Sequence, residues 1–187
     1  MTDLVFEPWI GAKYESGNRF GLRVLVLGES HYGDEPESHS GYTTAIVRKL
    51  GQKERHPFFT KVAKVLLETD KDIDNETRAE VWEHVAFYNY IQCLAGSSAR
   101  IRPTPEMWDE AKVPFLSILD RLLPDVILVL GKSLSDHAPL TEIQDRVVVC
   151  GIKHPSTAFS YGKWIPCFTN AIDRAKNRPS RSGGLPS

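Results

Sequence analysis

The chain has 187 residues, 41% of them apolar, which is ordinary for one globular domain with a hydrophobic core. Its formal net charge of −1 excludes a uniformly basic protein, and no apolar run is long enough to cross a membrane. Three cysteines without a CxxC pair argue against a disulfide framework or a cysteine-only metal cluster. The start also lacks the layout of a secretory signal, so we expect a cytoplasmic protein.

Four runs of β-branched and apolar residues predict strands. In chain order they cover residues 22–28, 85–92, 125–131 and 146–152. Helical patterns lie between and after them, at residues 43–50, 57–69, 104–123, 132–139 and 166–177. Pro57 and Thr104 are good starts for two of these helices, and Pro114 is expected to kink the helix over 104–123. The alternation predicts an α/β protein with a parallel sheet covered by helices on both faces.

Polar residues gather where three of the predicted strands end. These ends are residues 28–33, 89–93 and 151–156. Open α/β sheets bind ligands at the carboxyl ends of their strands, so we expect a site there. The polar segment 34–56 follows the first of these ends directly. It is either a lid over the site or a surface loop.

Positive charge is concentrated in the last part of the chain. Residues 150–187 hold six lysines and arginines but one acid, Asp173. Such a basic end permits a face that binds phosphate groups. We expect residues 1–178 to form a single domain and residues 179–187 to be a flexible basic tail.

The stretch GESHYG, residues 28–33, ends the first predicted strand. It resembles the G-x-S-x-G turn of a serine hydrolase, in which the serine is the nucleophile. Gly28 and Ser30 fit that pattern, but Tyr32 stands where the second glycine is required. A serine esterase built on Ser30 is therefore one hypothesis, although a bulky side chain obstructs the sharp turn.

Several stretches, read together, favour a different hypothesis. GESHYG is similar to the first motif of the uracil-DNA glycosylase superfamily, and KHPSTAFSY at 153–161 resembles its second catalytic motif. FYNYIQC at 87–93 and the segment 102–133 resemble parts of that superfamily's iron–sulfur branch. PFFTKVAKVL at 57–66 is similar to the segment that carries a stacking phenylalanine. The resemblance runs in order over about residues 20–175.

The resemblance implies a three-layer αβα sandwich around a central four-stranded parallel sheet, and a single glycosylase-like domain over residues 1–178. The iron–sulfur branch uses four cysteines. Cys93 is the one cysteine here in a matching place, so we expect no cluster, no other metal and no cofactor. The implied partner is DNA, with neither a membrane nor an obligatory protein partner.

The resemblance also implies catalytic roles. His154 would donate a hydrogen bond to a base carbonyl oxygen while the base leaves as an anion. Ser30 stands where the best-known members carry a water-directing aspartate, and it could hold that water without activating it. Glu29 could position water or stabilise the sugar cation, and His31 is the alternative partner for the water.

Four residues are candidates for binding the target base, which must be flipped out of the duplex to be reached. Asn89 offers both a donor and an acceptor to a pyrimidine edge. Tyr32 matches a position beside the pyrimidine C5. Phe58 matches the stacking position, and Tyr42 is a second candidate for stacking. The plain alternatives are a turn-forming asparagine and core-packed aromatic residues.

The loop after His154 is expected to press into DNA. Phe159 could fill the gap left by the flipped base, and its alternative is packing against the last helix. Ser156, Ser160, Lys153 and Lys163 could hold the flanking phosphates.

The resulting hypothesis is a DNA glycosylase that hydrolyses the N-glycosidic bond of a flipped-out uracil or modified pyrimidine and leaves an abasic site. Uracil is the default substrate of the superfamily, but some members act on bulky modified pyrimidines such as those of phage DNA. The biological role is then either base-excision repair or defence against phage DNA. The alternative from another class is a catalytically inactive nucleic-acid-binding module on the same fold.

Overall fold

The computed structural model describes residues 6–31, 40–94 and 102–179. Five strands form one sheet in the order β1-β3-β2-β4-β5. They are β1 (Trp9–Ile10), β2 (Val24–Gly28), β3 (Ala86–Asn89), β4 (Val126–Leu130) and β5 (Val148–Ile152). The protein therefore belongs to the α/β class, as the alternating pattern predicts.

The sheet is mixed and has five strands, which corrects the expectation of four parallel strands. β2, β3, β4 and β5 are the four expected strands and pair in parallel. The fifth, β1, pairs antiparallel with β3 and places Trp9 opposite Phe87. β1 has two residues and no alternating pattern. Long-range hydrogen bonds hold it, including one from Trp9 Nε1 to the Trp82 carbonyl at 2.9 Å.

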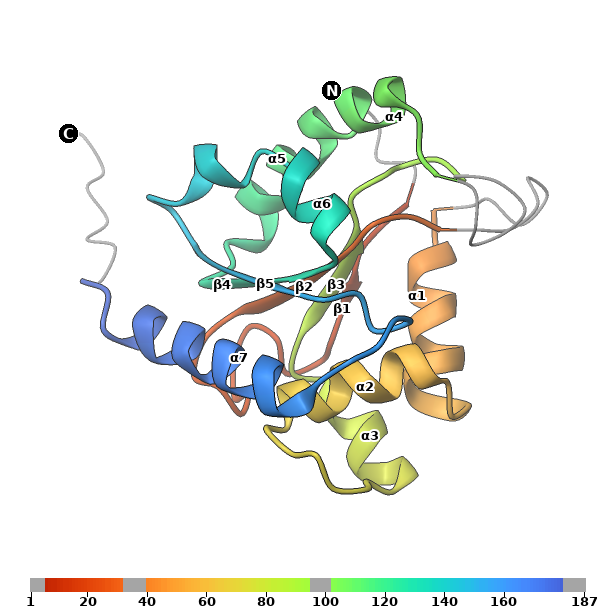
Figure 1. Ribbon diagram of the computed structural model, residues 1–187, viewed down its shortest axis with the longest axis vertical. Helices are drawn as coiled ribbons and strands as arrows, with labels where there is room; N and C mark the ends of the chain where they lie inside the picture. The colour runs from red at the N-terminus through yellow and green to blue at the C-terminus, as the bar shows by residue number, and fades with distance from the viewer. Residues whose placement is uncertain (1–5, 32–39, 95–101, 180–187) are drawn as a thin grey trace.

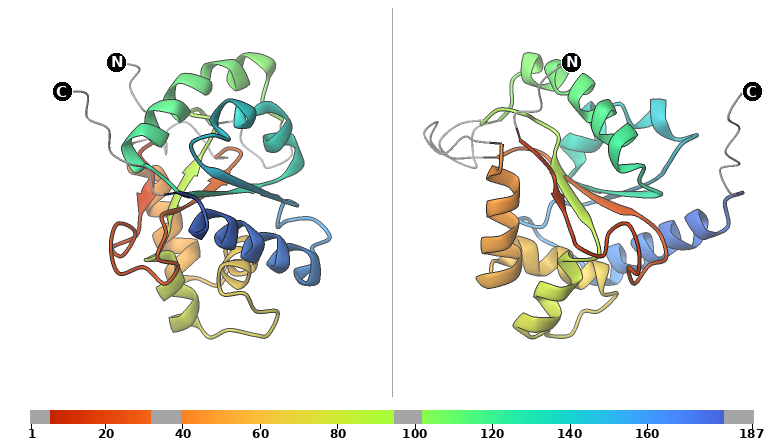
Figure 2. Two further views of the ribbon diagram at one scale, coloured as in Figure 1. Left: turned by 90° about the vertical axis from the view of Figure 1, so that its left-hand side faces the viewer. Right: turned by 180° about the vertical axis from the view of Figure 1, so that it is seen from behind.

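Helices cover both faces of the sheet, so the fold has three layers (Figures 1 and 2). One layer contains α4 (Pro105–Glu110), α5 (Lys112–Leu122) and α6 (Lys132–His137). The other contains α2 (Pro57–Leu66), α3 (Asn75–Trp82) and α7 (Tyr161–Lys176). A short helix, α1 (Tyr42–Ile46), continues into a π-helical segment, η2 (Val47–Lys53), at the side of the sheet. A 3₁₀ turn, η3 (Leu140–Ile143), precedes β5.

Alternation along the strands divides the core into two halves. Val24 and Val26 face the side that holds α2 and α7, while Leu25 and Leu27 face the side that holds α5. All four side chains are fully buried. Successive strand residues point to opposite faces, so a strand between two helical layers must be apolar throughout. This requirement explains the near-continuous apolar runs in the sequence.

The helices differ from the sequence predictions at three places. The helix expected over 104–123 is two helices, which meet at Ala111, because Pro114 has no N–H to donate to the Glu110 carbonyl. The Thr104 cap is confirmed, since its hydroxyl accepts the Met107 N–H. α3 was not predicted, because its sequence is mostly polar. Finally, α7 begins at Tyr161 rather than at residue 166.

Within the part of the chain that the structure describes, no helix has both the length and the apolar character needed to span a membrane. Cys93, Cys150 and Cys167 are free thiols. The predicted basic tail, residues 179–187, lies outside the described residues except for Pro179.

Candidate functional site

A cavity of about 360 Å³ lies at the carboxyl ends of β2 and β3, beside α1, η2, α2 and the loop after β5. Its polar lining is Glu29, Ser30, His31, His56, Asn89, His154 and Ser156. Its apolar and aromatic lining is Gly28, Tyr42, Ile46, Leu50, Phe58, Phe59 and Phe87. Pockets for small organic ligands span roughly 300–1,000 Å³, so the cavity has room for one small ring-shaped molecule.

The turns after three different strands contribute to this cavity, as the sequence pattern predicts for a parallel sheet. Gly28 ends β2 directly beside Asn89, which ends β3. A Cβ at Gly28 would lie 2.1 Å from Asn89 Oδ1. The glycine is therefore needed so that the carboxamide of Asn89 can extend across the end of the neighbouring strand.

Asn89 is 5% exposed, yet its carboxamide makes no hydrogen bond within the described part of the chain. Its backbone carbonyl accepts a hydrogen bond from Gln92 Nε2 at 2.9 Å. The side chain of Gln92 is itself held by the Phe6 N–H at 3.0 Å. The turn is thus fixed by its backbone, and the donor and acceptor of the Asn89 side chain remain available to a ligand.

Glu29 and Ser30 form the turn after β2. The Glu29 carbonyl accepts the Ile91 N–H at 2.9 Å, which ties this turn to the one after β3. Among the described residues, the Glu29 carboxylate has no hydrogen-bond or ion-pair partner. The hydroxyl oxygen of Ser30 is buried and has no partner in that part of the chain either. Both side chains therefore keep unused hydrogen-bonding capacity at the cavity.

His31 is buried and already engaged. Its Nε2 lies 2.8 Å from the hydroxyl oxygen of Thr43, and its ring packs edge-on against Phe6 and Tyr42. Burial lowers the pKa of His31 to about 4, so the ring is neutral near pH 7. These contacts join the turn after β2 to α1. They make His31 a weaker candidate for binding a ligand or a water molecule than the sequence pattern suggests.

His154 follows β5 in a loop that other residues fix. Its Nδ1 accepts the Ser156 N–H at 3.2 Å, and its carbonyl accepts the Thr157 hydroxyl at 2.8 Å. From α2, Lys61 Nζ donates to the Pro155 carbonyl at 2.7 Å. Burial, and to a lesser degree the positive charge of Arg102, lowers the pKa of His154. A neutral ring with Nδ1 accepting carries its proton on Nε2, which can then donate to a ligand.

Aromatic rings form one side of the cavity. The centroid of the Phe58 ring lies 5.4 Å from that of His154, and the ring planes are inclined at 45°. Phe58 is half-buried, whereas Phe59 behind it is buried in the core and meets it edge-on at 5.2 Å. Tyr42 is buried and also lines the cavity. Phe58 therefore presents part of its ring to a ligand, while Phe59 serves mainly the core.

The residues predicted to contact DNA are less closely grouped. Ser156 is exposed and lines the cavity. Lys153, Ser160 and Lys163 are exposed around it but are not part of its lining. Phe159 is half-buried, and its ring packs edge-on against Tyr161 at 5.5 Å. This packing is the alternative stated for Phe159, so a wedge role would require the ring to leave these contacts. Tyr32 lies outside the described residues.

Sequence reasoning missed some lining residues. His56 lines the cavity, and its buried Nδ1 has no hydrogen-bond partner among the described residues. It directly precedes Pro57, so the predicted start of α2 already placed it near the site. Ile46 and Leu50 also line the cavity, but no motif marks them, since they come from the segment 34–56 that we expected to be a lid or a loop.

The geometry does not favour the serine esterase hypothesis. A nucleophilic serine needs a neighbouring base, usually a histidine within hydrogen-bond reach. Ser30 Oγ has no such partner in the described part of the chain. His31 is bonded to Thr43, and the Nδ1 of His154 accepts from Ser156.

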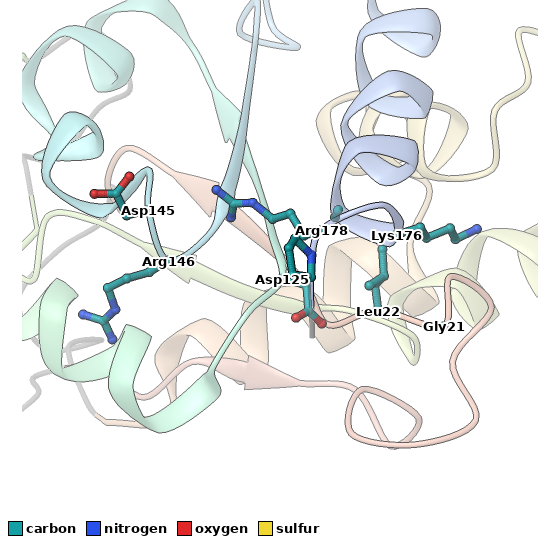
Figure 3. Close-up of a pocket in the computed structure, with 9 residues that line it drawn as sticks. Gly21, Leu22, Asp125, Asp145, Arg146, Lys176 and Arg178 are labelled. Carbon is teal, nitrogen blue, oxygen red and sulfur yellow. The ribbon is translucent and has the colours of Figure 1, made fainter. Parts of the chain in front are cut away.

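A second pocket, of about 440 Å³, lies at the opposite ends of the strands (Figure 3). Its charged lining is Asp125, Asp145, Arg146, Lys176 and Arg178. Asp125 Oδ2 accepts the Arg23 N–H at 2.8 Å, and the Arg178 guanidinium donates to the Gln144 carbonyl. Figure 3 shows Arg146 and Lys176 pointing to opposite sides. Asp125 and Arg178 therefore bond to the protein itself, and Arg146 and Lys176 do not converge on one point.

No group of three or more His, Cys, Asp or Glu side chains that could hold a metal ion is found within residues 6–31, 40–94 and 102–179. A scan against protein-family models finds no match to this chain, and a search of curated proteins finds none with significant sequence similarity.

Proposed function

We propose that this protein is a DNA N-glycosylase with a uracil-DNA glycosylase-like fold. It binds a flipped-out uracil or modified pyrimidine in the cavity at the carboxyl ends of the strands and hydrolyses its N-glycosidic bond. The observation that carries the proposal is the arrangement of Glu29, Asn89 and His154. These side chains come from the turns after three different strands, and all of them line one cavity. These are the turns that resemble the motifs of the superfamily.

Base recognition follows from the groups that have no hydrogen-bond partner among the described residues. The carboxamide of Asn89 supplies a donor and an acceptor, which suit the alternating acceptor and donor of a pyrimidine edge. Phe58 presents an aromatic face for stacking, a contact worth about 1–3 kcal/mol per base. The remaining lining is largely apolar, so a bound ring displaces water from these side chains and the hydrogen bonds to it are strengthened.

Bond cleavage leaves a sugar cation and a base anion, and the site suits both charges. His154 is held with Nε2–H available, and this N–H donates to a base carbonyl oxygen as negative charge develops there. Glu29 stabilises the sugar cation through its negative charge. Ser30 holds the water whose oxygen adds to the sugar carbon while the bond to the base breaks, and the proton lost by the water goes to solvent or to the departing base. The carboxylate of Glu29 takes over part of the role that an aspartate at position 30 has in the superfamily.

The test is release of a base from DNA. The full chain is incubated with DNA that contains uracil and with DNA that contains modified pyrimidines, and mass spectrometry identifies any free base. His154→Ala should lower the rate about 100- to 1,000-fold, which is the usual loss when one donor to a developing oxyanion is removed. The matched control is His137→Ala, because His137 is exposed on α6 and away from the cavity.

The pH profile adds a second readout. Because the pKa of His154 lies below its ordinary value, the neutral imidazole persists as the pH falls through 6.5, and activity should persist with it. DNA binding without base release, unchanged by His154→Ala, would instead identify a catalytically inactive binding module. Release of uracil in preference to modified pyrimidines would favour repair, and the reverse would favour defence.

A further inference from the structure

The apolar wall of the cavity differs chemically from the polar turns at the strand ends, and it comes from one continuous segment of the chain. Tyr42, Ile46 and Leu50 belong to α1 and η2, and Phe58 follows on α2. Ile46 and Leu50 offer only hydrocarbon to the cavity, whereas the strand-end turns supply carboxamide, carboxylate, hydroxyl and imidazole groups. We call Ile46 and Leu50 the aliphatic wall. A ligand that bonds to the strand ends must fit the rest of its volume against this wall.

The aliphatic wall is part of an irregular helix. η2 is π-helical over Val47–Lys53, and its last turn closes with a hydrogen bond from the Glu54 N–H to the Lys49 carbonyl at 2.7 Å. π-helical turns are uncommon and are often found at functional sites, since their extra residue displaces the following side chains. Leu50 belongs to these π-helical turns and lines the cavity.

A buried arginine holds this helix in place. Arg78 of α3 is 0% exposed, and its guanidinium donates to the carbonyls of Leu50, Gly51, Gln52 and Lys53. No carboxylate is among its partners in the described residues. The positive charge is compensated by the carbonyl end of η2, where the helix dipole is negative. Burial of a cation without a carboxylate is costly, so each of these carbonyls has to remain in place.

We propose that Leu50 and Ile46 determine the size of the base that the cavity accepts, and that Arg78 is the positioning residue that fixes where they stand. This inference rests on the proposed function. Ile46 and Leu50 line the same cavity as Asn89 and His154, so the proposal is that the ring substituent of a pyrimidine bonded to Asn89 and His154 lies against the aliphatic wall. A larger side chain at position 50 therefore excludes bases with bulky substituents, and a smaller one admits them.

The experiment compares substrates within one protein sample. DNA with uracil and DNA with a 5-alkyluracil are offered to the wild type and to each variant, and the ratio of the two kcat/KM values is recorded. This ratio is independent of the folded fraction. Relative to the wild type, Leu50→Ala should raise the ratio of alkylated to plain base about 10-fold, and Leu50→Trp should lower it about 10-fold, the size expected for one or more methylenes in an apolar pocket.

The control variants distinguish an effect of the position of the aliphatic wall from a general effect on core packing. Leu116→Ala removes a partly buried leucine on α5, from the core on the other face of the sheet, and should leave the ratio within about 2-fold of the wild type. Arg78→Met should shift the ratio because the wall moves, and Arg78→Lys should restore it in part. Arg178→Met, which removes an exposed arginine far from the cavity, should not change it. A role of Arg78 in folding alone would lower both rates equally and leave the ratio unchanged.

Failure of the inference differs from failure of the proposed function. If base is released but the Leu50 variants keep the wild-type ratio, the aliphatic wall does not determine specificity. If the wild type releases no base, the proposed function fails, and the same ratio is measured by nuclear magnetic resonance from the dissociation constants of free uracil and 5-alkyluracil. An unchanged ratio there, or no binding of either base, overturns the inference as well.

Discussion

The two ends of the same parallel sheet have different chemical character. At the carboxyl ends, the cavity combines apolar rings with side chains that have no partner among the described residues, such as Asn89 and Ser30. At the amino ends, the pocket in Figure 3 is more highly charged, but Asp125 and Arg178 bond to the backbone of neighbouring segments. Volume and charge alone would favour the pocket at the amino ends as the functional site. Hydrogen-bonding capacity that the described residues leave unused, beside a largely apolar lining, favours the cavity at the carboxyl ends.

This contrast shows why a group's partners matter more than its charge. A buried hydroxyl without a hydrogen bond among the described residues, such as that of Ser30, costs free energy, and binding of a ligand can recover that free energy. An exposed arginine that donates to a carbonyl is satisfied and screened by water, and it contributes little to recognition. The comparison can be tested by paired substitutions, one at each end of the sheet.

The largest difference is expected between Asn89 and Asp125. Asn89→Ala should lower the rate of base release about 100- to 1,000-fold, because it removes a donor to the base as negative charge develops there. Asp125→Ala removes the acceptor of the Arg23 N–H and should lower the free energy of unfolding by about 1 kcal/mol, without changing the rate. Rates come from single-turnover base release and stabilities from urea unfolding. Equal loss of activity in both variants would refute the assignment of the site to the carboxyl ends.

Acid sensitivity should be traceable to His31 at the carboxyl ends. The ring has a pKa of about 4 in the folded protein, but close to 6.5 when unfolded. Between these values the unfolded chain binds a proton that the native state does not, so stability is complete above pH 6.5 and falls as the pH drops toward 4. The loss should reach about 3 kcal/mol.

The measurement is the free energy of unfolding by urea between pH 7 and pH 4, for the wild type and for His31→Gln. The variant keeps a hydrogen-bonding side chain for Thr43 but cannot titrate, so its stability should depend less steeply on pH. A variant that retains the full wild-type slope would show that other groups cause the acid sensitivity.

The smallest effects are expected from two glycines, one at each end of the sheet. Gly28→Ala places a Cβ against the flexible end of the Asn89 side chain, so it should lower base release about 10-fold with little loss of stability. Gly21 lines the other pocket with φ +64° and has no atom within 4 Å of an added Cβ. Gly21→Ala should therefore cost about 1–2 kcal/mol through backbone strain, with an unchanged rate. The reverse pattern, strain at Gly28 and lost activity at Gly21, would contradict the comparison.

Much of the fold could be predicted because its signals are local. The apolar runs identified β2 to β5, while Pro57 located the start of α2 and the Thr104 cap located the start of α4. Elements with weak local signals were missed. β1 has two residues that pair with β3 only in the folded chain, and α3 has too few apolar residues to show a helical period.

The candidate site likewise has features that could be predicted from local sequence and features that could not. Glu29, Asn89 and His154 were predicted because they follow strands or resemble motifs. Their common cavity followed from the rule for parallel sheets, and the structure places all three in its lining. The engagement of His31 with Thr43 was beyond prediction, since it joins two segments whose approach depends on the packing of α1.

The sequence by itself determined the α/β class, the strands that are buried on both faces, and the turns that carry the hydrogen-bonding side chains, because these depend on the periodicity and residue types of neighbouring positions. Tertiary structure alone decided which of those side chains are left without partners among the described residues. It also decided which segment closes the cavity, and that a buried arginine of α3 holds this segment. These properties depend on contacts between residues far apart in the chain, and such contacts have no local signature.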